Sequence, residues 1–177
     1  MRIITGKYKG RHFDIPRTFK ARPTTDFAKE NIFNVLTGYL DFDGTTALDL
    51  FSGTGSITLE LLSRGCSQVV SVELDRDHHR FIQQCVQKLG AAPDVQCIRS
   101  DVFRFVKGCH RQFDFIFADP PYALPQLPQI PDLIFERDIL APDGLFVFEH
   151  GKDNDFSAHP RFVEHRQYGS VNFSLFR

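Results

Sequence analysis

The chain has 177 residues, of which 42% are hydrophobic and 24% are charged, which suits one globular domain with a buried core. It contains no run of 18 apolar residues and its first residues lack the apolar stretch of a signal peptide, so we predict no membrane span and a cytoplasmic protein. The four cysteines are far apart and form no C-x-x-C pair, which favours reduced thiols and argues against a metal site.

Charge is distributed unevenly along the chain, although the net charge is only −1. Residues 1–22 carry seven Lys or Arg against one acid, whereas the other 155 residues carry 14 Lys or Arg against 21 Asp or Glu. A basic end on an acidic body indicates a polyanionic partner at that end. A solvated basic hairpin without any partner would carry the same charges.

Residues 1–16 are predicted to form a β-hairpin, in which residues 2–5 and 11–15 pair across a turn bounded by Gly6 and Gly10. The tip carries Lys7, Tyr8 and Lys9. Two cations around an aromatic ring suit phosphate contact and base stacking. Residues 17–22 are interpreted as a basic linker, so that residues 1–22 extend the main domain without a core of their own.

A helix is predicted after Pro23. Thr24 or Thr25 can cap it, Asp26 suits the positive end of its dipole, and Gly38 ends it. Its expected buried stripe consists of Phe27, Ile32, Phe33, Val35 and Leu36.

From residue 46 onward, short apolar strands alternate with amphipathic helices. Strands are expected at 46–50, 68–73, 95–99, 112–118 and 144–150, and helices at 57–64, 76–89, up to about 107, and 127–140. Residues 162–166 and 170–176 suit a closing antiparallel pair. Residues 23–177 are therefore predicted to form one α/β domain with a mostly parallel sheet and an antiparallel final strand. In such sheets the ligand lies beyond the carboxyl ends of the strands.

Acidic residues follow successive predicted strands, next to a glycine turn. Asp49 precedes Gly53 and Gly55, which form a G-x-G turn without the third glycine of a dinucleotide site. Glu73 ends the second strand and can accept both hydroxyls of a ribose, with Leu74 packing on an adenine. A tight β–α turn alone would also explain the glycines.

A third acid, Asp101, follows the third strand and can accept a hydrogen bond from an adenine amino group. It can equally cap the helix that follows. With Phe51 and Val102, the acids and glycines suggest a pocket for a ligand that carries positive charge and no phosphate. This set resembles the Rossmann-like, class I methyltransferases that use S-adenosyl-L-methionine, a cofactor with an ammonium and a sulfonium group.

The segment Asp119-Pro120-Pro121-Tyr122 ends the fourth strand. It resembles the signature of enzymes that methylate exocyclic or amide nitrogens. The Asp119 carboxylate and the Pro120 carbonyl can each accept one N–H of an amino group, which directs the nitrogen lone pair at the methyl donor. Tyr122 can stack on the base. The motif alone fits adenine N6 as well as guanine N2.

The whole chain is similar to the RsmD-type bacterial 16S rRNA guanine-N2 methyltransferases. The matching motifs are Arg2-Ile3-Ile4-x-Gly6-x-x-x-Gly10-Arg11, Arg22-Pro23-Thr24-x-Asp26-x-x-x-Glu30-x-x-Phe33-Asn34-x-Leu36, Leu48-Asp49-Leu50-Phe51-x-Gly53-x-Gly55, Leu62-Ser63-Arg64-Gly65 and Glu149-His150. This resemblance implies that the enzyme methylates N2 of one guanine of 16S rRNA in an assembled or assembling 30S subunit.

The resemblance also assigns residues to roles. It implies that Asp119, Pro120 and Tyr122 bind the target guanine and that the acids and glycines at the earlier strand ends hold the cofactor. It further implies that the basic N-terminal hairpin binds rRNA, which would place the polyanion beside the site, and that Arg22 and Thr24 lie near it. The predicted RNA-binding residues are Arg2, Lys7, Tyr8, Lys9, Arg11, Arg22 and Thr24. We expect a monomer. The alternatives are an adenine-N6 nucleic-acid methyltransferase and a non-catalytic ribosome-assembly factor.

Overall fold

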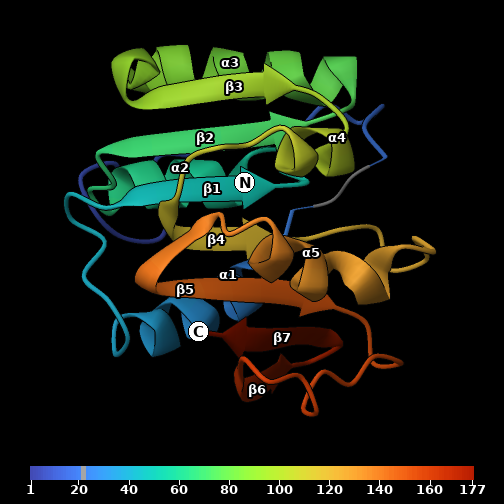
Figure 1. Cartoon of the computed structure of the whole chain (residues 1–177). Helices are drawn as coiled ribbons and strands as arrows, with labels where there is room; N and C mark the ends of the chain where they lie inside the picture. Colours follow the sequence, from blue (N-terminus) through green and yellow to red (C-terminus); the bar gives the residue numbers. More distant parts are fainter. Residues whose placement is uncertain (21–22) are drawn as a thin grey trace.

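The computed structural model describes residues 1–20 and 23–177. It contains one seven-stranded sheet with the order β3-β2-β1-β4-β5-β7-β6 (Figure 1). The strands are β1 Thr46–Leu50, β2 Gln68–Glu73, β3 Val95–Arg99, β4 Phe113–Ala118, β5 Leu140–His150, β6 Phe162–Tyr168 and β7 Val171–Phe176. The helices are α1 Asp26–Leu36, α2 Ser56–Ser63, α3 Arg76–Leu89, α4 Val102–Lys107 and α5 Ile130–Glu136, with short 3₁₀ helices η1 Ala92–Asp94 and η2 Leu127–Gln129.

The sheet has the predicted mixture of directions. Strands β1 to β5 are parallel to their neighbours, whereas β7 is antiparallel to both β5 and β6. The bounds of β1, β2, β3 and α3 are those predicted from the sequence. The α/β class, the mostly parallel sheet and the antiparallel final strand are therefore confirmed.

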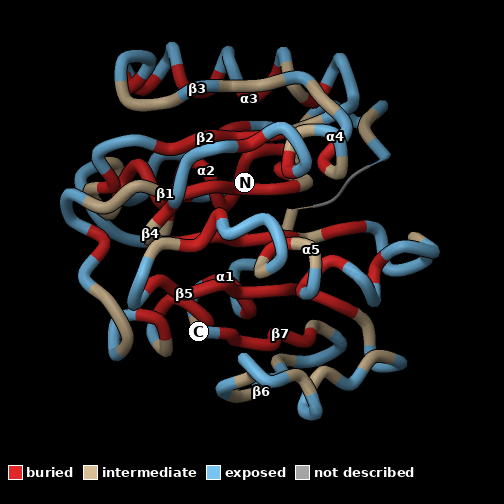
Figure 2. Tube along the Cα trace, viewed as in Figure 1, coloured by how far each residue is buried: buried red, intermediate tan, exposed pale blue. Residues whose placement is uncertain are grey.

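Two hydrophobic cores cover the two faces of the sheet. Helices α1, α2 and α3 pack with the N-terminal segment on one face, and α4 and α5 pack on the other. The central strands are buried along most of their length (Figure 2). Because both faces are covered, the central strands consist of almost continuous apolar residues, as parallel sheets require.

The buried face of α1 differs from the prediction. Phe27 is 63% exposed and Val35 is only half-buried, whereas Ala28 and Lys29 are buried with the expected Ile, Phe and Leu residues. Thr25 is the N-cap, since its hydroxyl accepts the Ala28 N–H at 3.2 Å. The pattern was misread because a buried lysine occupies a position on the core face, which hydrophobicity alone assigns to the surface.

The predicted helix 127–140 is also wrong at its end. Helix α5 stops at Glu136, and β5 begins at Leu140, four residues before the predicted start at 144. Asp138 adopts the left-handed conformation with φ of 52°, which ends the helix and turns the chain into the strand.

The N-terminal hairpin has less regular pairing than predicted, because the described residues contain an isolated bridge between Arg2 and His12 and no strand there. The Ile3 N–H bonds the Arg11 carbonyl at 3.0 Å, and the Gly10 N–H bonds the Ile3 carbonyl at 2.9 Å. The next two N–H groups, of Ile4 and Thr5, leave the hairpin and donate to a side chain of α2. A regular ladder is therefore replaced by contacts with the core.

That side chain is Glu60, which is fully buried and joins three parts of the chain. Its carboxylate accepts the N–H groups of Ile4 at 2.8 Å and Thr5 at 3.1 Å, and the Arg64 Nε at 2.9 Å. The Lys29 ammonium lies 3.4 Å from Glu60 and donates to the Arg2 carbonyl at 2.7 Å. Burial lowers the pKa of Lys29, although the charge of Glu60 opposes that shift. The network fixes residues 2–5 against α1 and α2.

The tip of the hairpin lies at the amino edge of the sheet. Helix α2 runs back from the end of β1 toward the start of β2, so its last residue, Ser63, is at that edge. The Ser63 carbonyl accepts the Lys7 N–H at 2.9 Å, and the Ser63 hydroxyl accepts the Tyr8 N–H at 3.0 Å. In Figure 1 the dark blue N-terminal segment bends round at the side where β1 and β2 begin.

All four cysteines are free thiols, as predicted. Within residues 1–20 and 23–177, the structure has no helix with both the length and the apolar character needed to cross a membrane.

The two hairpin glycines provide a matched test of this docking. Both adopt left-handed conformations, with φ of 99° at Gly6 and 84° at Gly10. A Cβ on Gly6 would lie 2.0 Å from the Ser63 carbonyl oxygen, whereas a Cβ on Gly10 would meet nothing within 4 Å. Gly10→Ala should destabilise the fold by about 1–2 kcal/mol through backbone strain. Gly6→Ala should cost about 1–3 kcal/mol more, through overpacking. Urea unfolding measures both, and equal losses would contradict the docked arrangement.

Candidate active site

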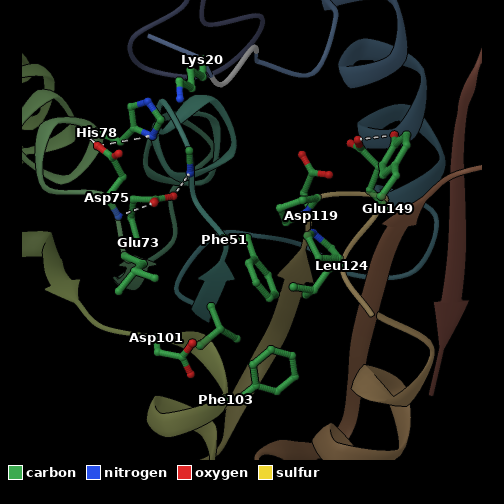
Figure 3. Close-up of a pocket in the computed structure, with 16 residues that line it drawn as sticks. Lys20, Phe51, Glu73, Asp75, His78, Asp101, Phe103, Asp119, Leu124 and Glu149 are labelled. Carbon is green, nitrogen blue, oxygen red and sulfur yellow. Dashed lines mark hydrogen bonds and ion pairs between the residues drawn. The ribbon is translucent and has the colours of Figure 1, made fainter. Parts of the chain in front are cut away.

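A cavity of about 820 Å³ opens at the carboxyl ends of the parallel strands. Of the residues predicted from the sequence to form the site, it is lined by Phe51, Gly53, Glu73, Leu74, Asp101, Val102, Asp119, Pro120 and Tyr122. The lining residues that were not predicted are Lys20, Asp75, His78, Phe103, Pro121, Leu124 and Glu149. Figure 3 shows Asp119 and Glu149 on one side of this cavity and Glu73 and Asp75 on the other.

Strand register explains why the acids meet. Leu50 of β1 pairs with Ala118 of β4, and Ala118 pairs with Phe148 of β5, so these strands reach the edge level with one another. The residues that follow, Asp119 and Glu149, are therefore neighbours. The Asp119 N–H donates to the Leu50 carbonyl at 3.2 Å, which fixes the start of the Asp-Pro-Pro-Tyr segment.

Glu73 holds the glycine turn in place. One of its carboxylate oxygens accepts the Gly53 N–H at 2.7 Å, and the other accepts the Asp75 N–H at 2.8 Å. Gly53 adopts φ of 57° with open space around its Cα, as a close approach of a ligand requires. Both oxygens of Glu73 keep a further lone pair for a ligand hydroxyl.

Gly55 lies outside the cavity lining. Its φ is 85°, and a Cβ there would lie 2.9 Å from Cγ1 of Ile82 on α3. Packing between the turn and α3 therefore explains this glycine without a ligand. Its predicted contact with the cofactor stays a prediction.

Asp49 is buried in a small hollow beside the main cavity, together with Thr24, Gly53 and Asp119. The Thr58 hydroxyl donates to its carboxylate at 2.6 Å. Burial raises the pKa of Asp49 to about 7, and this outweighs the hydrogen bond, which acts in the opposite direction. A positively charged ligand group would compensate the buried carboxylate.

Apolar side chains and a further carboxylate, Asp101, also line the cavity. Phe51 adopts the strained φ of 58° and packs edge to face on Phe103, with ring centres 6.3 Å apart. Leu74 is 59% exposed, which leaves it available to pack on a flat ring. Asp101 caps α4 by accepting the Arg104 N–H at 3.0 Å, so the capping interpretation is correct, and its second oxygen makes no hydrogen bond within the described residues.

Glu149 connects the Asp-Pro-Pro-Tyr segment with the residues that precede α1. Its carboxylate is 5% exposed and accepts hydrogen bonds from the Thr24 hydroxyl at 2.9 Å and the Tyr122 hydroxyl at 2.8 Å. The pKa of Asp119 is raised well above its usual range, first by burial and then by the charge of Glu149 and a hydrogen bond with it. The pKa of Tyr122 is raised by burial and by the same carboxylate. Burial and the neighbouring Glu149 therefore favour the protonated form of Asp119.

The predicted RNA-binding residues do not lie together. Thr24 is in the hollow beside the cavity, and Arg2 pairs with Asp26 at 3.4 Å near the start of α1. Lys7, Tyr8, Lys9 and Arg11 lie at the amino edge of the sheet, where Arg11 donates to the Lys88 carbonyl at 3.2 Å. The sequence analysis expects the hairpin to bring a polyanion beside the site, and the structure has the basic tip at the edge of the sheet opposite the cavity. Arg22 is outside the described residues, and RNA binding by this set stays a prediction.

Glu149 is the functional candidate that the sequence analysis missed. It is an acid at the carboxyl end of a buried apolar strand, which is the same signal that identified Glu73 and Asp119. In the sequence it stands within the Glu149-His150 motif of the family resemblance. Lys20 also lines the cavity, and no periodic pattern marked it.

The fold and the site define the class of protein. The sheet order, the glycine turn after β1 and the acids at successive strand ends are those of the class I, S-adenosylmethionine-dependent methyltransferase fold. Residues 1–177 match the family described as conserved hypothetical protein 95. The chain belongs to this family, which is the RsmD family.

Relatives and solved structures agree with this assignment. The chain is 36% identical to the putative rRNA methyltransferase YlbH of Bacillus subtilis over 86% of this chain and 84% of that protein. It is 29% identical to ribosomal RNA small subunit methyltransferase D of Escherichia coli K12 over 100% of this chain and 89% of that protein. A structure of the putative methyltransferase yhhF of E. coli superposes with a TM-score of 0.87 at 26% identity, over 99% of this chain and 96% of that chain.

A more distant structure shares the fold alone. The 16S rRNA N2 methyltransferase RsmC of T. thermophilus, in complex with AdoMet and guanosine, has a TM-score of 0.70 at 19% identity. The match covers 90% of this chain and 44% of that chain.

The raised pKa of Asp49 predicts how stability changes with pH. As pH rises above about 4, the unfolded chain releases the Asp49 proton while the folded protein retains it, so the free energy of unfolding falls until about pH 7. The raised pKa of Asp119 should likewise lower the free energy of unfolding as pH rises. Asp49→Asn should therefore reduce the slope by up to about 1.4 kcal/mol per pH unit. Urea unfolding between these pH values tests this, with the exposed Asp14→Asn as control. Parallel curves for wild type and Asp49→Asn would contradict it.

Proposed function

We propose that this protein transfers a methyl group from S-adenosyl-L-methionine to the exocyclic N2 of a guanine in 16S rRNA, in the assembled or assembling 30S subunit. It would act as a monomer in the cytoplasm. The observation that carries the proposal is the Asp119-Pro120-Pro121-Tyr122 segment, which lines a cavity shared with the acids of β2 and α4. Family membership supports rRNA as the substrate, since full-length relatives are named ribosomal RNA small subunit methyltransferase D.

The residues of the cavity fit the cofactor. Asp49 is a buried carboxyl that accepts hydrogen bonds from Thr58, and the cofactor's ammonium can supply a compensating positive charge. The free lone pairs of Glu73 suit the ribose hydroxyls, and Asp101 with Leu74 and Val102 suits the adenine. When bound, S-adenosylmethionine supplies an electrophilic methyl group on a sulfonium sulfur.

The chain positions the accepting nitrogen. An aromatic amino group is a weak nucleophile because its lone pair is delocalised into the ring. Asp119 and the Pro120 carbonyl can accept its two hydrogens, which favours a pyramidal nitrogen with its lone pair toward the methyl group. Tyr122 is 46% exposed and can offer one ring face to the base. Most of the acceleration would come from holding the two reactants in line.

A second candidate is transfer to adenine N6. The chain is 35% identical over 79 residues, 44% of its length, to a tRNA1(Val) (adenine(37)-N6)-methyltransferase of Histophilus somni. The match covers less than half of the chain, whereas the RsmD-family match covers all of it. We therefore favour guanine N2.

The decisive experiment is transfer of a tritiated methyl group to 30S subunits, naked 16S rRNA and DNA, followed by nucleoside analysis. The expected product is N2-methylguanosine from 16S rRNA. Recovery of N6-methyladenosine would support the second candidate instead. Absence of transfer to every substrate would favour the non-catalytic assembly factor.

Asp119→Ala should abolish transfer, because one acceptor for the amino group is lost, while the affinity for S-adenosylmethionine stays within about twofold. Calorimetry measures the affinity, and a single-turnover assay measures transfer. Turnover by this variant comparable to wild type would refute the role of Asp119.

Cofactor affinity should depend on the ionisation of Asp49. Burial raises the pKa of Asp49 to about 7, so its carboxyl is largely protonated below that pH, and only the ionised form attracts the cofactor's ammonium. The affinity should therefore rise about fivefold between pH 6 and 7, in proportion to the ionised fraction of Asp49. Asp49→Asn should bind weakly and with little pH dependence. The same pH response in that variant would contradict the assignment.

A further inference from the structure

The cavity contains two neighbouring carboxyl groups, Asp119 and Glu149, whereas the proposed methyl transfer requires only Asp119. Binding both hydrogens of an amino group needs Asp119 and the Pro120 carbonyl alone. Glu149 is nevertheless placed beside Asp119 by the pairing of Ala118 with Phe148, and it lines the same cavity. Burying a second carboxyl next to the first is unfavourable unless both find partners.

Two hydroxyl groups fix the Glu149 carboxylate and leave some of its lone pairs free to accept further hydrogen bonds. One of its oxygens accepts the Thr24 hydroxyl and the other accepts the Tyr122 hydroxyl. A carboxylate can accept about four hydrogen bonds. Two lone-pair sites therefore remain on a side chain that is fixed in position and lines the cavity.

The two purines differ at the positions that such a pair would contact. In guanine the N2 amino group is adjacent to N1–H, so two donors point in the same direction. In adenine the N6 amino group is flanked by N1 and N7, which are both acceptors. Two neighbouring carboxylates match two neighbouring donors, whereas an acceptor placed against a carboxylate leaves both unpaired.

We propose that Glu149 accepts the N1–H of the target guanine while Asp119 accepts the adjacent N2–H, so that this carboxyl pair selects guanine over adenine. The proposal rests on the proposed function and names the residue that decides its base specificity. The two N–H donors would satisfy acceptor oxygens of both carboxyl groups. Thr24 and Tyr122 are positioning residues, because they orient Glu149 and each comes from a different segment of the chain.

Nucleosides that have only one of the two N–H donors distinguish the contact with Glu149 from the contact with Asp119. Guanosine has both N1–H and the N2 amino group, inosine has only N1–H, and 2-aminopurine riboside has only the amino group. Calorimetry on the full chain saturated with S-adenosylhomocysteine measures their dissociation constants without any methyl transfer. Wild-type protein should bind guanosine roughly ten to a hundred times more tightly than 2-aminopurine riboside, since a buried unpaired acceptor is left in the second case.

Glu149→Gln should reduce that ratio to about one, because its amide N–H can donate to the bare N1 of 2-aminopurine. Tyr122→Phe is the matched control: it removes one hydrogen bond to Glu149 but keeps the carboxylate. It should weaken the binding of guanosine and inosine slightly, leave that of 2-aminopurine riboside nearly unchanged, and retain most of the ratio. A purely structural role of Glu149 would make both variants weaken binding without changing the ratio.

If a variant does not fold, the nucleoside affinities of the wild-type protein still test the proposal. Guanosine that binds no more tightly than 2-aminopurine riboside, or that shows no measurable binding, would overturn it. N2-methylguanosine in the transfer assay combined with equal nucleoside affinities would refute only the role of Glu149. A guanosine preference without transfer to rRNA would instead refute the proposed function.

Discussion

The site depends on one geometric constraint, which is that β1, β4 and β5 reach the same edge of the sheet in register. Leu50, Ala118 and Phe148 lie side by side, so the residues after them converge without any long-range loop. A shift of one residue in β4 would turn the side chain of Asp119 to the other face of the sheet. Packing of Phe115, Ile116 and Phe117 on both faces prevents that shift, because each of them is buried.

The strands and their terminal acids could be predicted from the sequence because both follow local rules. Apolar runs bounded by turns gave β1, β2 and β3 with their observed limits, and an acid at the end of each run indicated the cavity. Lys29 and Glu60 could not be found in this way. Their burial depends on a partner more than 30 positions away, and a hydrophobicity pattern places any charged residue on the surface.

The same buried pair explains why the N-terminal segment is part of the core although its composition resembles that of a free basic arm. Glu60 receives two backbone N–H groups of this segment, and Ile3 and Phe13 are buried in the core on that face. The distribution of charge along the sequence does not reveal that the N-terminal segment packs on α2. It also does not reveal that α2 leads from the carboxyl edge of the sheet back to the amino edge, where the hairpin tip lies. The basic tip therefore lies at the amino edge of the sheet, whereas the cavity lies at the carboxyl edge.

The electrostatics of the cavity follow from the burial of its carboxyl groups. Burial raises the pKa of Asp49 and of Asp119, and nearby carboxylates add to this effect, namely Glu73 at Asp49, and Glu149 and Asp49 at Asp119. Their neighbours are hydroxyl groups of Thr58, Thr24 and Tyr122, which donate hydrogen bonds but carry no charge. Such a site favours ligands that supply a positive charge and N–H donors. An ammonium beside Asp49 and the donor edge of a purine beside the other two acids would satisfy the same set of carboxyl groups at once, so each ligand would favour the binding of the other.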